Sequence, residues 1–299
     1  MSLTSVAAPR VPANAVSVAW RTLYWSVRRE LWENRSIYIA PLVTGAIFVA
    51  GFVATLMMMP ERLTDSMSMG PMFRHAKVVE PYLTAALFIM GVGVVVGVFY
   101  CLDALYAERR DRSILFWKSL PVSDRTTVIS KLTVALIILP LITTLVTAVV
   151  HVLMLLASSA ALMMGGAGVA PLWREVKPMM LLSQVTFHMV TMHILWYAPL
   201  YGWLLLASAL ARRAAFLWAG IPILAVVAVE KLVFSSSRFW DVLKLRLFGG
   251  GELFINSTNP IEHVNPTAFF SSPHLWIGLV LAAVLIAAAV QVRRRNGPA

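Results

Sequence analysis

The chain has 299 residues, of which 59% are hydrophobic and 13% are charged, and its formal net charge is +11. A soluble domain is normally about half apolar and a quarter charged, so this composition excludes an ordinary soluble globule and indicates a polytopic membrane protein. The basic residues lie in short clusters at the ends of apolar runs, which argues against a nucleic-acid-binding arm. The single cysteine, Cys101, leaves no intrachain disulfide.

The first expected element is an amphipathic helix within an N-terminal tail, residues 1–36. Apolar residues recur there every three or four positions, and charged residues occupy the other faces of the helix. This spacing is typical of a helix that lies along a membrane surface. A soluble helix packed on a partner is the alternative. The apolar positions are Val16, Trp20, Leu23, Val27 and Leu31.

Six apolar runs are long enough to span a bilayer, which takes about 20 residues. We therefore expect an all-α fold with a six-helix transmembrane domain over residues 37–292 and a short tail over 293–299. The fourth run is longer than a bilayer requires, so we expect a kink near Pro199 and some projection from the membrane. The runs cover residues 37–59, 82–105, 132–163, 179–211, 215–234 and 275–292.

The distribution of basic residues predicts the orientation of these spans. With the N-terminus inside, the inner side carries 16 and the outer side 9 of the 25 lysines and arginines. Because cytoplasmic loops are enriched in positive charge, both termini are expected on the cytoplasmic side. The expected membrane is the inner cell membrane. The second span contains Gly93 and Gly97, whose spacing favours close helix contact.

A charged and aromatic segment, Glu108–Asp124, separates the second and third apolar runs. Its residues 113–120 are long enough for a short helix, which Pro121 would end, and Ser123 or Asp124 is placed to cap the following helix. Large apolar side chains lie among arginines and a lysine, which is typical of a docking surface. A segment that only lies on the membrane is the alternative. The apolar residues are Ile114, Phe116, Trp117 and Leu120.

Residues 106–131 resemble the region between the second and third spans of the permeases of type-2 ATP-binding-cassette exporters. Glu108, the turn Ser119-Leu120-Pro121-Val122-Ser123 and Lys131 match the pattern of that family. The family also has six spans, an N-terminal surface helix and a long outer segment before the last span. No substrate signature accompanies this resemblance.

The resemblance implies that residues 113–120 form a coupling helix, which sits in a groove of a separate ATPase subunit. ATP and magnesium would bind to that subunit, because this chain has no GxxxxGK[ST] loop and is not expected to be an enzyme by itself. Phe116 and Trp117 would serve as anchors, and the arginines would pair with carboxylates. The implied coupling residues are Glu108, Arg109, Arg110, Arg112, Ile114, Phe116, Trp117, Lys118, Leu120 and Pro121.

The same resemblance implies a second permease copy, or a related permease, with the substrate pathway between the two. Residues of the second and fifth spans would face that pathway. The candidate residues are Phe88, Val92, Val95, Phe99, Trp218, Leu224 and Val227.

Ionisable residues within the spans leave two other functions open. His151, His188 and His193 could bind a haem or a metal in a redox protein, but there is no HExxH motif, and hydrogen-bonded neutral histidines explain them equally well. Glu230 and Lys231 at the outer end of the fifth span are expected either to snorkel or pair with each other near the headgroups, or to place a polar group at the outer mouth of a pathway. A non-transporting sensor or assembly component docked to the same ATPase is the remaining alternative.

Overall fold

A computed structural model describes residues 14–59, 61–119, 122–249 and 266–295. Within these ranges the chain contains helices and no β-strand, and six helical segments are long and apolar enough to cross a membrane. The chain is therefore an all-α polytopic membrane protein, as the composition predicts. The six segments are Ser36–Met58, Phe73–Arg110, Asp124–Met164, Ala170–Trp196, Ala215–Phe234 and Pro273–Arg295.

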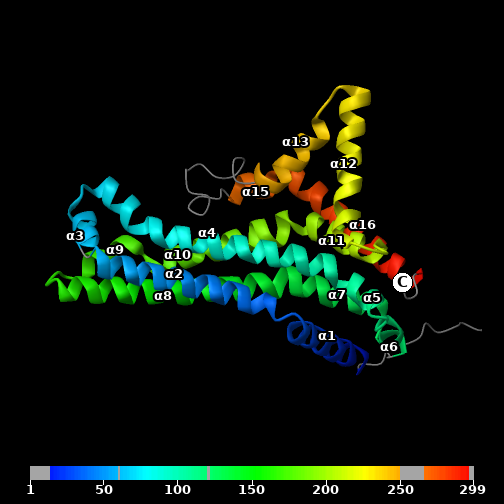
Figure 1. Cartoon of the computed structure of the whole chain (residues 1–299), viewed down its shortest axis with the longest axis horizontal. Coiled ribbons are helices and arrows are strands. Elements are labelled where there is room, and N and C mark those ends of the chain that lie inside the picture. Colours follow the sequence, from blue (N-terminus) through cyan, green and yellow to red (C-terminus); the bar gives the residue numbers. More distant parts are fainter. Residues whose placement is uncertain (1–13, 60, 120–121, 250–265, 296–299) are drawn as a thin grey trace, which may run out of the picture.

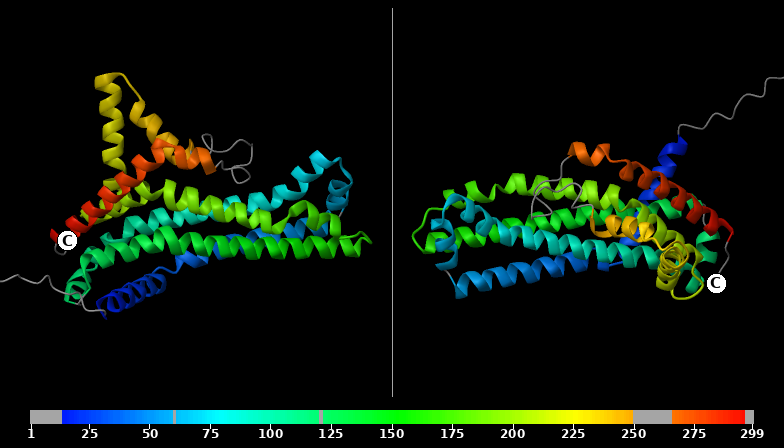
Figure 2. Two further views of the ribbon diagram at one scale, coloured as in Figure 1. Left: turned by 180° about the vertical axis from the view of Figure 1, so that it is seen from behind. Right: turned by 90° about the horizontal axis from the view of Figure 1, so that it is seen from above.

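Helices α2 (Ser36–Met58), α4 (Pro71–Ala104) and α8 (Leu139–Met164) run alongside one another for most of their length (Figures 1 and 2). Buried side chains such as Ile89 and Met154 fill the space between them. Small residues set the closest approaches: a Cβ added at Gly45 would lie 2.8 Å from a methyl group of Val150, and one at Gly93 would lie 2.8 Å from the hydroxyl of Thr143. A larger residue would force these helices apart.

The fourth apolar run differs from the single kinked span expected from the sequence. It comprises α10 (Pro178–His188), the π-helical segment η2 (Met189–Trp196) and, after Tyr197, α11 (Ala198–Leu210). Pro199 lies in the first turn of α11, where its missing N–H costs no helical hydrogen bond. The candidate span in this region begins earlier, with α9 (Ala170–Val176), and ends at Trp196, while α11 packs against α16 (Pro273–Arg295).

Helix α12 (Ala215–Phe234) extends away from the bundle, across its long axis (Figure 1). Within the described chain only Ala215 and Ala219 of this apolar helix are buried. Ala214 and Ser235, which flank the helix, both have left-handed backbone conformations with φ of 45° and 47°. From the tip of α12 the chain returns through α13 (Arg238–Lys244) and η3 (Leu245–Gly249) towards α15 (Pro266–Ser271) and α16.

Several short helices gather at one end of the bundle (Figure 1). They are α1 (Asn14–Glu33), α5 (Tyr106–Arg110), α6 (Ile114–Ser119) and α7 (Asp124–Thr133), together with the last turns of α16. Helix α7 continues through η1 (Val134–Ile138) into α8. The Ser123 hydroxyl accepts a hydrogen bond from the backbone N–H of Thr126 at 3.1 Å, which confirms the predicted cap. At the opposite end, α3 (Glu61–Ser68) and α9 pack against α4.

Candidate functional site: a buried charge cluster beneath helix α6

Four charged residues from four different helices are buried together next to α6. Their exposed fractions are 1% for Glu30, 6% for Glu108, 2% for Lys131 and 4% for Arg293. Charged side chains are almost never fully buried unless they are paired. We call these four residues the charge cluster.

Each member of the charge cluster is paired with another. The Lys131 ammonium lies 2.8 Å from a carboxylate oxygen of Glu30 and 3.1 Å from one of Glu108. Arg293 forms a salt bridge with the other oxygen of Glu108, and its Nε lies 3.1 Å from a carboxylate oxygen of Asp124. Ionic contacts therefore join α1, α5, α7 and α16.

Helix α1 contributes more than one residue to this arrangement. A guanidinium nitrogen of Arg29 lies 2.6 Å from Glu30, and the Tyr100 hydroxyl donates a hydrogen bond of 3.0 Å to the other oxygen of the same carboxylate. Burial alone would raise the pKa of Glu30, but the positive charges of Lys131 and Arg29 outweigh it, so the pKa lies below the ordinary value. Glu30 is therefore ionised at neutral pH.

A second set of contacts ties α5 to the end of α11. The Arg109 guanidinium is 5% exposed and donates hydrogen bonds to the backbone carbonyls of Ser208, at 2.9 Å, and Ala211. The Ser208 hydroxyl accepts hydrogen bonds from the backbone N–H groups of Leu105 and Tyr106, at 3.0 and 2.9 Å. The junction between α4 and α5 is thereby fixed to α11.

Helix α6 lies next to the charge cluster and has apolar side chains on both its buried and its exposed face. Ile114 is 1% exposed and packs inside the chain, so it is not accessible to a partner in this arrangement. Leu115 and Phe116 are 58% and 59% exposed. The side chains of Trp117 and Lys118, and residues Leu120 and Pro121, lie outside the described part of the chain.

The remaining two arginines of this segment are on the surface. Arg110 forms a hydrogen bond of 2.9 Å with Asp111 and lies 3.7 Å from Asp103. Arg112 is exposed and has a positive φ of 55°, so it makes the turn that leads into α6. Among the four implied charged coupling residues whose side chains are described, Glu108 and Arg109 thus face inwards and Arg110 and Arg112 face outwards.

Sequence reasoning anticipated Glu108 and Lys131 but missed their partners. Glu30 pairs with Lys131 across 101 positions and Arg293 pairs with Glu108 across 185, and local periodicity says nothing about contacts over such separations. Glu30 directly follows Arg28 and Arg29 among the charged residues of the predicted amphipathic helix, and this local pattern gave no sign that its carboxylate would be buried.

The candidate pathway residues on α4 share one face of that helix. Phe88, Val95 and Phe99 are 55%, 54% and 66% exposed, and Val92 is half-buried. On α12, Trp218 and Leu224 are 42% and 64% exposed, and Val227 is half-buried. These residues therefore lie largely on the outer surface of the single chain.

Two histidines of the spans, His151 and His193, have hydrogen-bond partners within the chain. His151 Nε2 lies 2.9 Å from the carbonyl oxygen of Tyr82, and His193 Nε2 lies 3.2 Å from both the carbonyl oxygen of Ala135 and the hydroxyl of Tyr201. Across the described residues, no three histidine, cysteine or acidic side chains, His188 included, group closely enough to hold a metal ion.

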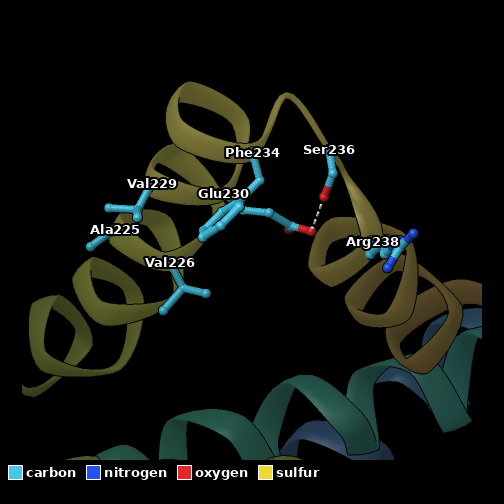
Figure 3. Close-up of a pocket in the computed structure, with 7 residues that line it drawn as sticks. All are labelled: Ala225, Val226, Val229, Glu230, Phe234, Ser236 and Arg238. Atoms are coloured by element: carbon cyan, nitrogen blue, oxygen red, sulfur yellow. Dashed lines mark hydrogen bonds between the residues drawn. The ribbon is translucent and has the colours of Figure 1, made fainter.

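Glu230 stabilises the corner between α12 and α13. Its carboxylate accepts a hydrogen bond from the Ser236 hydroxyl and another, at 2.9 Å, from the backbone N–H of Phe239. Figure 3 shows this side chain directed from α12 towards Ser236. Both residues, together with Arg238 of α13, line a cavity of about 710 Å³. The hydrogen bonds of Glu230 are to Ser236 and Phe239, not to Lys231, with which the sequence suggested a mutual pair.

The fold and this site define the protein as a helical multi-pass membrane protein that has a buried charge cluster at one end of its helix bundle. No protein-family model, curated protein or solved structure matches the sequence.

Proposed function

We propose that this chain is the permease subunit of an ATP-binding-cassette exporter in the inner cell membrane, and that α6 docks on a separate ATPase subunit. One observation carries the proposal: the exposed apolar side chains of α6 closely follow Glu108 of α5, which buried ionic contacts connect to α7 and α16 and, through Lys131, to α1. Such a connection suits an element that transmits force. ATP and magnesium belong to the partner, and this chain supplies no hydrolysis.

The charge cluster provides a path by which a displacement of α6 would be transmitted to the membrane-spanning helices. Removing one member of a buried ion pair costs about 3 to 5 kcal/mol, because the other charge is left uncompensated. Glu108 lies next to α6 and pairs with both Lys131 and Arg293. When α6 moves, α7 and α16 must therefore move with it, and Arg109 carries the same displacement to α11.

A second permease copy, or a related permease, would complete the transporter. The α4 face that contains Phe88 and Phe99 and most of α12 are apolar and uncovered by the rest of the described chain. A pathway between two copies would place those faces opposite each other.

Removal of the exposed anchors tests the docking of α6. We expect Leu115→Ala/Phe116→Ala to abolish co-purification of the ATPase, because interface hot spots cost about 2 kcal/mol each, equivalent to about thirtyfold in affinity. Insertion into the membrane should be unchanged, since both side chains lie outside the packed core. The added substitution Trp117→Ala extends the same test to the other anchor that the resemblance implies.

Arg125→Ala is the matched control, because Arg125 is exposed and lies at the start of α7, just beyond this segment. It should leave ATPase binding and hydrolysis unchanged. If the double variant binds its ATPase and transports normally, α6 is only a membrane-surface segment. If ATPase binding and hydrolysis depend on α6 but no transport occurs, the chain is a docked sensor or assembly component.

A further inference from the structure

An apolar cavity of about 440 Å³ lies on the far side of the bundle from α2, bounded by α11, α12, the α13–η3 segment and α16. Its walls include Pro199 and Trp203 from α11, Ile223 from α12, Leu243 from α13 and Leu281 from α16. The volume is within the range of about 300 to 1,000 Å³ that is usual for small-molecule sites. The cavity can hold an apolar chain.

One cation interrupts this apolar lining. Arg246 of η3 is the one lysine or arginine among the described residues that line the cavity, and no acidic side chain of the described chain pairs with it. Its Nη2 donates a hydrogen bond of 3.0 Å to the carbonyl oxygen of His274, whereas its buried Nη1 has no hydrogen-bond partner among the described residues. Burial lowers the pKa of Arg246, as expected for a cation without a nearby anion.

The position of this guanidinium is built into the fold. Its Cζ lies 4.3 Å from the centroid of the Trp196 ring, and the Trp196 N–H donates a hydrogen bond of 3.0 Å to the Arg246 carbonyl. The hydroxyl of Tyr197 likewise donates to the carbonyl of Leu247 at 3.4 Å. On the other side, Gly278 leaves the space that the guanidinium occupies, since a Cβ at this position would overlap it.

We propose that this cavity binds the acyl chain of an anionic amphiphile, with a carboxylate or phosphate oxygen of its headgroup accepting a hydrogen bond from Arg246 Nη1. The apolar walls recognise the chain, and the guanidinium recognises the anion. A neutral chain would leave the buried N–H unsatisfied, which is unfavourable. This site is distant in the sequence from α6 and does not depend on docking of an ATPase.

Fatty acids and anionic phospholipids share this chemistry, and competition binding separates them. The full chain in neutral detergent is titrated with palmitate, 1-hexadecanol and dioleoyl phosphatidylglycerol, each competing with a fluorescent anthroyloxy-stearate probe. We expect palmitate to bind at least tenfold more tightly than hexadecanol. Tighter competition by the phospholipid than by palmitate would identify a membrane lipid as the ligand, and the reverse order would identify a free fatty acid.

Two variants assign the binding to this cavity. Arg246→Gln should reduce the preference for palmitate over hexadecanol to less than threefold, while Ile223→Trp, which fills the cavity, should weaken both ligands about equally. Lys244→Gln is the matched control, because Lys244 is an exposed cation on the same segment that does not line the cavity. It should bind like the unaltered chain.

The comparison of palmitate with hexadecanol needs no variant, so it decides the question even if a variant fails to fold. Equal affinity of the unaltered chain for the two ligands would overturn the proposal. Unchanged palmitate binding by a folded Arg246→Gln or Ile223→Trp protein would also overturn it. So would self-association of the chain that excludes the probe from the cavity.

Discussion

Lys131 is the residue on which the charge cluster depends most. It is 2% exposed and is the only member that contacts both buried glutamates, Glu30 and Glu108. A methionine of similar length would fill the same space, so packing alone does not explain a lysine at this position. Lys131 is explained by the two carboxylates that it neutralises. Glu30 and Glu108 are in turn explained by the contacts that they make between helices.

Lys131→Met should therefore destabilise the protein by about 3 to 5 kcal/mol, since two carboxylates lose a common buried cation. Glu30→Gln combined with Lys131→Met should recover part of the loss, because one unpaired charge is removed. Thermal unfolding in detergent measures both. Lys77→Met provides the control, because the Lys77–Glu80 pair is exposed and such pairs contribute about 1 kcal/mol or less. Equal midpoints for Lys131→Met and Lys77→Met would contradict the role given to the charge cluster.

The lowered pKa of Glu30 predicts a dependence of stability on pH. A carboxylate with a depressed pKa in the folded state stabilises that state above its unfolded pKa, about 4.3, and the contribution is lost as the pH falls through the folded value. The difference in unfolding midpoint between the unaltered chain and Glu30→Gln should accordingly be large at pH 7 and shrink in acid below pH 4. A difference that stays constant over this range would show that Glu30 is not the titrating group.

At the scale of elements, α4 and α11 pack closely against each other at Gly97. A Cβ at Gly97 would lie 2.8 Å from the hydroxyl of Tyr201 and 3.1 Å from a methyl group of Leu139. Tyr201 is fully buried, so it has little room to move. The close approach expected from the Gly93 and Gly97 spacing is present, although it serves contacts within the chain.

Gly97→Leu should thus destabilise the fold by about 1 to 3 kcal/mol through overpacking. Gly91→Leu is a matched control on the same helix, because no atom lies within 4 Å of a Cβ added there. Unfolding midpoints of the two purified variants give the comparison. Similar losses for both would mean that the change in helix propensity, and not the contact with Tyr201, is what matters.

Sequence periodicity predicted local features well and contacts between distant elements poorly. The length of an apolar run is sufficient to predict a helix such as α12 without knowledge of its tertiary contacts. The Ser123 cap can likewise be predicted locally, because it joins residues only three positions apart. The cluster joins Glu30 to Lys131 across 101 positions, so no local pattern contains it. The side of α6 that faces the protein interior is also determined by contacts with other helices. Ile114 is buried and Leu115 is exposed, although both are apolar residues of the same short helix.

At the scale of the whole molecule, the first and last described helices meet at the same end of the bundle as α6 (Figure 1). An even number of spans produces this arrangement. Together with the excess of basic residues at that end, it supports the prediction that both termini and α6 lie in the cytoplasm.

Single cysteines test that orientation in intact cells. In a Cys101→Ser background, cysteines that replace Ser5, Leu115 or Gly297 should resist a membrane-impermeant thiol reagent, and one that replaces Leu245 should react. All four should react after the cells are permeabilised, which controls for buried thiols. Labelling at residue 115 in intact cells would reverse the orientation.

The central claim is that this chain works with a separate ATPase, and stoichiometric co-purification from the cells that naturally make the protein tests it most directly. The chain is purified in mild detergent, its partners are identified by mass spectrometry, and ATP hydrolysis is measured before and after they are removed. We expect a partner with a GxxxxGK[ST] loop in an equal molar amount, and hydrolysis that disappears when this partner is removed. Hydrolysis by the isolated chain, or the absence of any such partner from an intact preparation, would contradict the claim.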